Sequence, residues 1–387
     1  MSLIDLTATA AFGLEAVVAR EVKDLGYTDT SVETGKVTFR ADPKGICRTN
    51  LWLRSAERVF VKMGEFSAKT FTELFDQTVE LPWADWMPEN AAFPVEGKSV
   101  KSQLHSVPDC QAIVKKAVVE SMKRKYRRQW FPETGPRFTI EVALLKDVAT
   151  LSIDTSGRGL HKRGYRKLSA KAPLKETLAA GMVNLSYWNP ERVLVDPFCG
   201  SGTIPIETAL IGLNLAPGLN RDFAAEEWPN VPAWLWKQAR EEARDLARRD
   251  RKLKIRGMDI DREVLSLARY HAREAGVEGC IHWQQMPFQS LQTKDKYGLI
   301  ICNPPYGQRL EDMDQVEALY QEMGKICRDF ESWSFYILTA HRGFERLFGR
   351  KADRNRKLYN GRIECHYYQY NGPRPPRREA SPDSKPD

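Results

Sequence analysis

Apolar residues in the first part of the chain recur at helical spacing and then at strand spacing. Between Gly13 and Leu25 they fall three and four positions apart, which predicts an amphipathic helix that ends at Gly26. Residues 32–39 then follow a strand pattern, with a turn at Gly35. This succession predicts a small α+β module at the start of the chain.

Residues 45–155 carry a second series of short helical and strand patterns. The apolar stripe at 110–130 predicts a long helix, whose end contains a dense group of cations. Cations near a helix C-terminus interact favourably with the helix dipole, so a solvated basic end is the alternative to a binding role. The other predicted elements are helices at 46–58 and 71–81 and strands at 59–63, 93–98, 137–145 and 149–154.

From residue 192 onward, buried strands alternate with helices. A strand at 192–196, a glycine-rich turn at 197–203 and a helix at 204–213 form the usual opening of a doubly wound sheet. A helix from 169 to 187 precedes it, and a charged helix at 237–249 is expected to be exposed to solvent. Further strands are predicted at 255–258, 280–285, 297–302 and 334–339, with a terminal antiparallel pair at 357–359 and 363–370.

The buried strand at 297–302 is followed at once by Asn303, Pro304, Pro305 and Tyr306. Two prolines cannot continue a sheet ladder, so they predict a stiff turn beyond the carboxyl end of the strand, where open α/β sheets bind ligands. The Asn303 amide oxygen and the Pro304 carbonyl are acceptors that could hold both hydrogens of a planar amine. Such acceptors stabilise charge that develops on nitrogen as a new bond forms, and Tyr306 could stack on a base. The alternative is a proline-rich turn that only ends a strand.

The glycine-rich turn at 197–203 has neither the P-loop spacing nor the dinucleotide fingerprint, which favours a smaller adenosine ligand. Asp196, before the turn, suits a cationic amine on that ligand. Asp259 directly follows the next strand and is placed to accept hydrogen bonds from ribose hydroxyls. Asp261 is expected to cap the helix that comes after it.

Composition narrows the class of protein without deciding its activity. The 387 residues carry a net charge of +8, and their lysines and arginines are clustered, which suggests a polyanionic partner. No apolar run is long enough to span a bilayer and no signal peptide is evident, so we expect a cytoplasmic protein without a membrane partner, as a monomer or weak dimer. The seven cysteines form no Cys-x-x-Cys pair, so we expect reduced thiols and no metal site.

A second basic stretch, at 156–167, combines glycines and cations with one aromatic residue. Glycine lets a backbone approach a ligand closely, and arginine and lysine recognise phosphates. A linker between two domains is the alternative interpretation of this stretch.

Three motifs resemble those of S-adenosylmethionine-dependent amino-methyltransferases. They lie at 196–203 (Asp-Pro-Phe-Cys-Gly-Ser-Gly-Thr), 257–261 (Gly-Met-Asp-Ile-Asp) and 303–306 (Asn-Pro-Pro-Tyr), in the order and spacing of motifs I, II and IV. Residues 100–116 and 160–166 resemble a THUMP RNA-binding domain and its exit. From about residue 1 to 372 the chain is similar to the guanine-N2 methyltransferase half of the bacterial bifunctional 23S rRNA methyltransferase. Such proteins are often labelled N6-adenine-specific DNA methylases.

The resemblance implies an α/β fold, with a Rossmann-like class I methyltransferase domain preceded by an α+β ferredoxin-like and THUMP RNA-binding module. We expect no second methyltransferase half in a chain of this length. The implied parts are a ferredoxin-like segment at 1–44, a THUMP-like domain at 45–156, a basic linker and helix at 157–190, a methyltransferase domain at 191–372 and a disordered tail at 373–387.

The resemblance also implies roles for individual residues. Asn303, Pro304, Pro305 and Tyr306 would hold the target amine and stack on its base. Many relatives have an Asp at the end of the third strand that touches the adenine amine. Here Gln285-Met286 stands in that place, which leaves the contact open among these two side chains and the backbone. The residues implied for S-adenosylmethionine are Leu174, Lys175, Asp196, Phe198, Gly200, Ser201, Gly202, Thr203, Asp259, Ile260, Gln285 and Met286. Those implied for RNA are Lys115, Lys116, Lys123, Arg124, Lys125, Arg127, Arg128, His161, Lys162, Arg163 and Arg166.

The activity that the resemblance implies is methyl transfer from S-adenosylmethionine to an exocyclic amine of a base in RNA. The expected target is N2 of a guanine in 23S rRNA or in a large-subunit assembly intermediate, and the base must be single-stranded or flipped out to reach the site. Methylation of adenine N6 in DNA or RNA is an alternative, and the THUMP-like half argues against DNA. Protein glutamine methylation also uses Asn-Pro-Pro-Tyr but does not explain the basic front half. A non-catalytic RNA-binding or ribosome-assembly factor would not need intact Asn303 and Tyr306.

Overall fold

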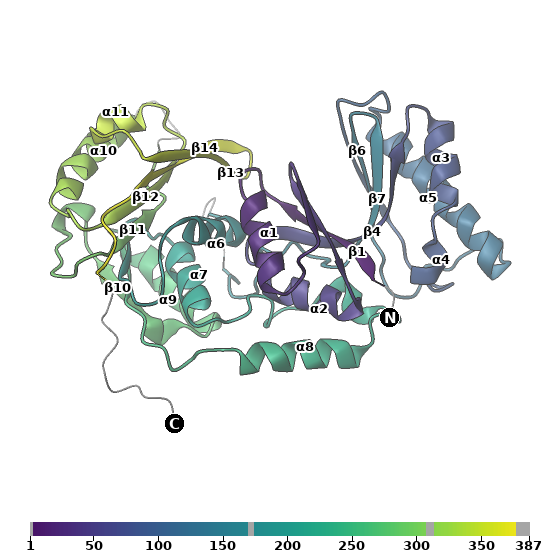
Figure 1. Ribbon diagram of the computed structural model, residues 1–387, viewed down its shortest axis with the longest axis horizontal. Helices are drawn as coiled ribbons and strands as arrows, with labels where there is room; N and C mark the ends of the chain where they lie inside the picture. The colour runs from purple at the N-terminus through teal and green to yellow at the C-terminus, as the bar shows by residue number, and fades with distance from the viewer. Residues whose placement is uncertain (1–2, 169–173, 307–312, 377–387) are drawn as a thin grey trace. The chain divides into compact units, whose positions relative to one another are not determined.

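Two compact units make up the chain, and each has its own seven-stranded sheet (Figure 1). The computed structural model describes residues 3–168, 174–306 and 313–376. The start of the helix predicted from 169, and most of the predicted tail, lie outside these residues. The first unit consists of Met1–Lys167, Lys175–Gly181 and Leu213–Arg249, and the second of Leu168–Leu174, Met182–Gly212 and Asp250–Asp387.

A single sheet runs through the whole first unit, in the order β2-β3-β1-β4-β7-β6-β5. The long strand β4 joins its two halves, because residues 56–61 pair with β1 and residues 60–67 pair with β7. The strands are β1 (Ile4–Ala10), β2 (Thr30–Glu33), β3 (Lys36–Ala41), β4 (Ala56–Ser67), β5 (Val95–Val100), β6 (Ile140–Leu145) and β7 (Val148–Asp154).

Two helices of the first unit, α2 and α3, begin where a side chain satisfies free backbone amides. Asp42 accepts a hydrogen bond from the Gly45 N–H at 2.9 Å at the start of α2, and Pro43 occupies its first turn. Thr70 and Glu73 form a capping box at the start of α3. The helices are α1 (Glu15–Asp24), α2 (Pro43–Trp52), α3 (Phe71–Val79), α4 (Trp83–Trp86), α5 (Val107–Tyr126) and α8 (Ala233–Asp245), with a 3₁₀ turn η1 (Ala224–Glu227).

The segment 213–249 packs on the first unit and completes its core. We expected the charged helix here to be solvent-exposed, and this is wrong for one face of α8. Trp236 is 3% exposed and its ring stacks on Phe223 with centroids 5.3 Å apart. Glu242 pairs with Lys44 at 2.9 Å. Among its many charged residues, α8 carries a narrow apolar stripe that is buried. The stripe consists of Leu235, Trp236, Ala239 and Ala243.

The sheet of the second unit has the order β10-β9-β8-β11-β12-β14-β13. Its first five strands are parallel and β14 is antiparallel to β12, as expected for a doubly wound sheet with a terminal antiparallel pair. The strand order reverses between β8 and β11, so a ligand crevice is expected beyond their carboxyl ends. The strands are β8 (Leu194–Asp196), β9 (Ile255–Asp259), β10 (Ile281–Gln285), β11 (Leu299–Cys302), β12 (Ser334–Thr339), β13 (Arg354–Asn360) and β14 (Ile363–Tyr370).

Helices pack on both faces of this second sheet (Figure 1). All four residues of β11 are buried, which explains the continuous apolar run that predicted this strand. No helix in the described part of the chain is long and apolar enough to cross a membrane. The helices are α6 (Glu176–Leu185), which contributes to both units, and α7 (Thr203–Gly212), α9 (Arg262–Glu274), α10 (Met313–Arg328) and α11 (Phe344–Phe348).

Most predicted elements are present, with shifts at their ends. The strand at 334–339 and the strand at 363–370 have the predicted bounds. Gly35 has a φ of +78° and separates β2 from β3, as expected. The predicted helix at 46–58 is too long, because the chain leaves α2 at Trp52 and soon enters β4.

We expect Trp228→Ala to destabilise the first unit by about 3–5 kcal/mol, the usual cost of truncating a large buried aromatic side chain. Trp228 is 2% exposed, stacks on Phe138 at a centroid distance of 4.5 Å, and donates its indole N–H to the Arg137 carbonyl at 3.0 Å. Trp234 in the same segment is 56% exposed, so Trp234→Ala should leave stability nearly unchanged. Urea unfolding followed by circular dichroism compares the two variants, and equal losses would contradict this packing.

Candidate active site

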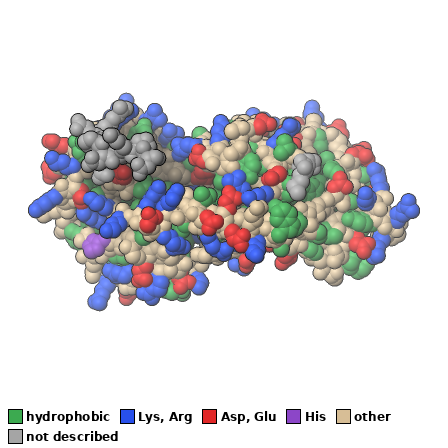
Figure 2. Space-filling view, turned by 60° about the horizontal axis from the view of Figure 1, so that its bottom comes forward, with side chains coloured by type: hydrophobic (Ala, Val, Ile, Leu, Met, Phe, Trp, Pro, Cys, Tyr) green, Lys and Arg blue, Asp and Glu red, His purple; other side chains and the backbone are tan. Residues whose placement is uncertain are grey.

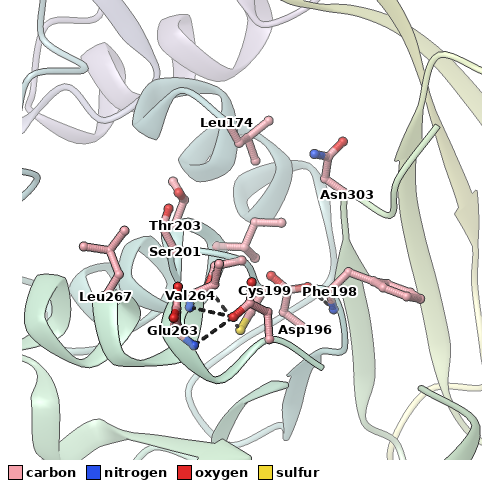
Figure 3. Close-up of a pocket in the computed structure, with 13 residues that line it drawn as sticks. Leu174, Asp196, Phe198, Cys199, Ser201, Thr203, Glu263, Val264, Leu267 and Asn303 are labelled. Atoms are coloured by element: carbon pink, nitrogen blue, oxygen red, sulfur yellow. Dashed lines mark hydrogen bonds between the residues drawn. The ribbon is translucent and has the colours of Figure 1, made fainter. Parts of the chain in front are cut away.

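A pocket of about 560 Å³ lies in the second unit at the carboxyl ends of β8 and β11. Figure 3 shows Asn303 on one side of it, with Ser201 and Thr203 across from it. The volume is within the range of small-molecule sites. The lining residues are Leu174, Asp196, Phe198, Cys199, Gly200, Ser201, Thr203, Ile204, Asp261, Glu263, Val264, Leu267 and Asn303.

The turn after β8 depends on two glycines. Gly200 has a φ of +52° and Gly202 a φ of +85°, values that favour glycine. The Gly200 N–H donates to Asp259 Oδ2 at 2.9 Å, and the Gly202 N–H donates to the Cys199 carbonyl at 2.8 Å. A Cβ at Gly202 would lie 2.7 Å from Cη2 of Trp283. The tryptophan behind the turn therefore requires glycine at this position.

Asp196 is a buried carboxyl group at the end of β8. It is 1% exposed, and its Oδ1 accepts a hydrogen bond from the Phe198 N–H at 3.2 Å. Burial raises the pKa of Asp196 well above its ordinary value; the Phe198 bond opposes this shift and the charge of Asp259 adds to it. A cation bound beside Asp196 would therefore stabilise the ionised form of this carboxyl group.

The two acids after β9 have different environments. Asp259 accepts from the Gly200 N–H through one oxygen and from the Asp261 N–H at 3.0 Å through the other, so it ties the glycine turn to the start of α9. Each carboxylate oxygen can accept a further bond, which leaves capacity for a ribose hydroxyl. Asp261 accepts from the N–H groups of Glu263 at 2.8 Å and Val264 at 3.2 Å, so it caps α9 as expected.

The turn after β11 is held by a phenol from α10. Tyr320 is fully buried, and its hydroxyl donates to the Pro305 carbonyl at 2.8 Å and lies 2.8 Å from Thr339 Oγ1. Burial raises the pKa of Tyr320, so the hydroxyl keeps its proton and remains a donor. Within the described residues, no group donates to the Pro304 carbonyl, and the buried Oδ1 of Asn303 has no hydrogen-bond partner. Two acceptors at this turn are therefore not engaged by any described residue.

Tyr306 is half-buried beside the tip of the β13–β14 hairpin. Its side chain hydrogen-bonds with the side chain of Asn360, the last residue of β13. Burial raises the pKa of Tyr306, so the phenol is neutral. The end of β13 therefore lies next to the ring that the sequence predicts to stack on a base.

Six of the twelve residues implied for the cofactor line this pocket, and six do not. Lys175 pairs with Glu57 at 3.0 Å within the first unit. Ile260 is 70% exposed, Gln285 donates to its carbonyl at 3.1 Å, and Met286 packs on the core. Gly202 and Asp259 shape the glycine turn without lining the pocket. The six that line it are Leu174, Asp196, Phe198, Gly200, Ser201 and Thr203.

Helix α9 contributes pocket residues that the sequence motifs did not indicate. Glu263, Val264 and Leu267 line the pocket from the first turns of this helix. They lie at helical spacing directly after β9, so a helix that begins at the carboxyl edge of the sheet presents them to the crevice. Among the described residues, no group of three or more His, Cys, Asp or Glu side chains could hold a metal ion.

The cations of α5 that were expected to bind RNA lie in the first unit, and most are paired with acids. Such pairs contribute little to stability where they are exposed to solvent. Lys116 lies over the Phe75 ring, with Nζ 5.7 Å from its centroid, and Arg127 ends the helix in a left-handed conformation. The pairs are Lys115–Glu133 at 2.6 Å, Lys123–Glu120 at 3.4 Å, Arg124–Glu80 at 2.7 Å and Arg128–Glu89 at 3.0 Å.

The basic residues of the glycine-rich loop 156–167 differ in their burial and in their charge. Burial lowers the pKa of His161 to about 4, although the charge of Glu57 opposes the shift, so this imidazole is neutral near pH 7. Arg163 is 3% exposed and donates to the carbonyls of Leu160 and Arg54. Lys162, in contrast, is exposed.

Three family models match successive parts of the chain. Residues 5–60 match the RlmL ferredoxin-like domain, residues 68–154 the THUMP domain, and residues 163–369 the UPF0020 family, an RMKL-like methyltransferase domain. Together with the sheet order, these matches confirm the predicted fold class of a Rossmann-like methyltransferase domain preceded by ferredoxin-like and THUMP domains.

Similar proteins extend over nearly the whole chain. "Putative RNA methyltransferase YpsC" of Bacillus subtilis (strain 168) is 50% identical over 372 residues, which are 96% of each chain. The crystal structure of a predicted N6-adenine-specific DNA methylase from Listeria monocytogenes str. 4b F2365 is 52% identical with a TM-score of 0.91, and the match covers 96% of this chain and 97% of that one. The crystal structure of SMU.472, "a putative methyltransferase complexed with SAH", is 47% identical with a TM-score of 0.91, over 97% and 100% of the two chains.

We expect Gly202→Ala to destabilise the second unit more than Gly276→Ala. Both glycines have positive φ, +85° and +71°, so each alanine meets the cost of a left-handed residue, about 1–2 kcal/mol. Gly276 has open space around its Cβ position, whereas Gly202 meets the Trp283 ring. Chemical unfolding followed by circular dichroism gives the two stabilities. Similar losses in the two variants would show that this contact does not constrain the turn.

Proposed function

Because the chain belongs to the RMKL-like methyltransferase family, we propose that it transfers a methyl group from S-adenosylmethionine to an exocyclic amine of a base in RNA. The more specific proposal is N2 of a guanine in 23S rRNA, as the resemblance of its motifs implies. The THUMP match and the name of the Bacillus subtilis relative support RNA as the substrate.

The residues around the pocket fit S-adenosylmethionine. The similar SMU.472 protein was crystallised as a complex with SAH, the demethylated form of this cofactor. In this chain the buried Asp196 would pair with the amino group of the methionine part, and Asp259 would accept from the ribose hydroxyls. Leu174, Val264 and Leu267 supply apolar contacts in the same pocket. When bound, S-adenosylmethionine supplies a methyl group on a sulfonium that leaves as a neutral thioether.

The buried Asn303 Oδ1, which has no partner among the described residues, carries the proposal for the target amine. A buried acceptor without a donor costs about 1–3 kcal/mol, so its persistence at a pocket edge indicates a function in ligand binding. Asn303 Oδ1 and the Pro304 carbonyl would accept the two hydrogens of an amine and favour a localised lone pair on its nitrogen. Held at a near-attack distance of about 3–3.5 Å, the amine needs no further activation for in-line displacement.

The supporting contacts fit this role. The hydrogen bond from Tyr320 engages the Pro305 carbonyl and leaves the Pro304 carbonyl available. Asn360 restricts Tyr306, which would stack on the flipped base. Both contacts position acceptors and ring before the base arrives, so little reorganisation accompanies the reaction.

Methylation of adenine N6 is the second candidate, and one observation favours it. The similar Listeria protein bears the name of an N6-adenine-specific DNA methylase. The corner after β11 could hold either amine, since both are planar NH2 groups on a base. Label transfer to 23S rRNA, tRNA and DNA, followed by nucleoside mass spectrometry, distinguishes the two products.

We expect Asn303→Ala to lower the turnover number by about 10²–10³-fold, the usual effect of losing one positioned hydrogen-bonding group. Affinity for S-adenosylmethionine and for RNA should change little, because Asn303 would contact only the target amine. Asn230→Ala, which alters an exposed asparagine of the first unit, serves as the control. Parallel loss of turnover and of both affinities would mean that Asn303 has only a structural role.

We expect binding of S-adenosylmethionine to release a proton from Asp196. Because the pKa of Asp196 is raised on folding, the contribution of this residue to the stability of the protein is fully present at low pH. This contribution is lost as pH rises through the pKa of the folded state. A bound ammonium group favours the carboxylate, so affinity should increase with pH over the same interval. Calorimetry in buffers of different ionisation enthalpy measures the released proton.

Asp196→Asn should abolish this proton release, whereas Asp261→Asn should retain it because Asp261 is an exposed helix cap. A binding enthalpy of the unchanged protein that is independent of the buffer at every pH tested would exclude the pairing between Asp196 and the ammonium group.

A further inference from the structure

A second pocket, of about 700 Å³, lies within the first unit and shares no lining residue with the candidate active site. It lies between the loop 156–167 and the segment 220–227. The acids on its lining are Glu176, Asp222 and Glu227. The cations outnumber them two to one and are Arg158, Lys162, Arg163, Arg166, Lys167 and Arg221. We name it the Arg221 pocket.

One wall of the Arg221 pocket, the loop 156–167, is bound by the guanidinium group of Arg221 from the other wall. Arg221 donates to the carbonyls of Gly159 at 2.6 Å and Lys162 at 3.1 Å from one nitrogen, and to those of Ser156 at 3.2 Å and Arg158 at 2.5 Å from the other. Four backbone carbonyls of the loop therefore converge on one side chain. The loop is a preorganised wall, and its backbone does not have to be ordered by a ligand.

Positive charge is concentrated around this guanidinium. The pKa of Arg221 is lowered to about 10, chiefly by burial and in smaller part by the nearby Arg163, Arg158 and Arg58, whereas Asp154 opposes the shift. Asp154 is itself buried and paired with Arg58. The nearby carboxylates thus do not neutralise all of the positive charge around Arg221. A bound anion would reduce the excess.

Two of the lining cations are available to such an anion. Arg158 and Lys162 are exposed, and the side chain of neither forms a hydrogen bond or salt bridge to any described residue. Arg166, by comparison, pairs with Glu176 at 3.3 Å. On the face shown in Figure 2, Lys and Arg side chains are interspersed with Asp and Glu, so the net charge of +8 does not form a uniform basic surface there.

The lining favours phosphates over bases as the bound groups. Base recognition on single strands usually requires an exposed aromatic ring for stacking. The one aromatic residue of the lining, Phe223, is 3% exposed and its ring stacks on Trp236. Arginine and lysine remain, and these bind phosphate oxygens irrespective of sequence.

We propose that the Arg221 pocket binds consecutive phosphates of the RNA substrate, with Arg158 and Lys162 as the contacting cations and Arg221 as the group that positions them. The proposal rests on the proposed function, because it assigns a place to the same RNA. The site lies outside residues 68–154, which match the THUMP domain, and its second wall comes from the segment inserted between α7 and β9. The Arg221 pocket would bind the RNA strand irrespective of its base sequence.

The test uses the full chain with Arg158→Ala and Lys162→Ala combined. Arg221 is left intact, so the loop keeps its support. We expect affinity for a short fluorescein-labelled single-stranded RNA to fall about tenfold or more at physiological salt, and the slope of log affinity against log salt to decrease by about 1 to 2. The combined variant Lys237→Ala and Arg244→Ala removes two exposed cations from α8 outside the pocket and serves as the matched control.

Three comparisons decide the outcome. Affinity and salt slope equal to those of the control would overturn the proposal. Loss of affinity only for RNA with a 5′ phosphate would overturn the assignment to internal phosphates, and inorganic phosphate as a competitor tests for a free-ion site. Affinity for S-adenosylmethionine should be unchanged in the variant, because neither residue lines the candidate active site. If the unchanged protein binds RNA through the pocket yet methylates none, the proposed function fails and this inference stands.

Discussion

The second unit keeps a buried amide oxygen to which no described residue donates, and the rest of the candidate site depends on this constraint. A flexible loop would relieve the cost by turning Asn303 toward water or a backbone N–H. Here the two prolines stiffen the turn and contribute no N–H, and the buried Tyr320 holds the Pro305 carbonyl. Because Thr339 at the end of β12 shares the Tyr320 hydroxyl, the packed core maintains the geometry of the corner.

The other wall of the site follows from the neighbouring strand. β8 pairs directly with β11, so the turn after Asp196 and the turn after Cys302 emerge side by side. Asp259 connects the first of these turns to α9 through two backbone N–H groups. The glycine turn and the Asn303 corner are therefore parts of one sheet edge, as the proposed methyl transfer between them requires.

The first unit is assembled from segments that are distant in the sequence. Its sheet continues through β4, and the segment 213–249 fills its core although it lies between α7 and β9 of the other unit in the chain. Arg221 from that segment supports the loop 156–167. The proposed phosphate site thus depends on the packing of the inserted segment within the first unit. For the same reason, removal of the N-terminal residues alone would not isolate a complete domain.

Local chemistry in the sequence determined a large part of this protein. Prolines after a buried strand, glycines at turns that need positive φ, and an acid before a predicted helix indicated the corner at Asn303, the turn at 200–202 and the capping role of Asp261. Only the tertiary structure decided which face of α8 is buried, that Glu263, Val264 and Leu267 line the pocket, and that Arg221 binds carbonyls up to 65 positions away. These features depend on which segments become neighbours, and the periodicity of a single segment carries no information about the partner that will cover it.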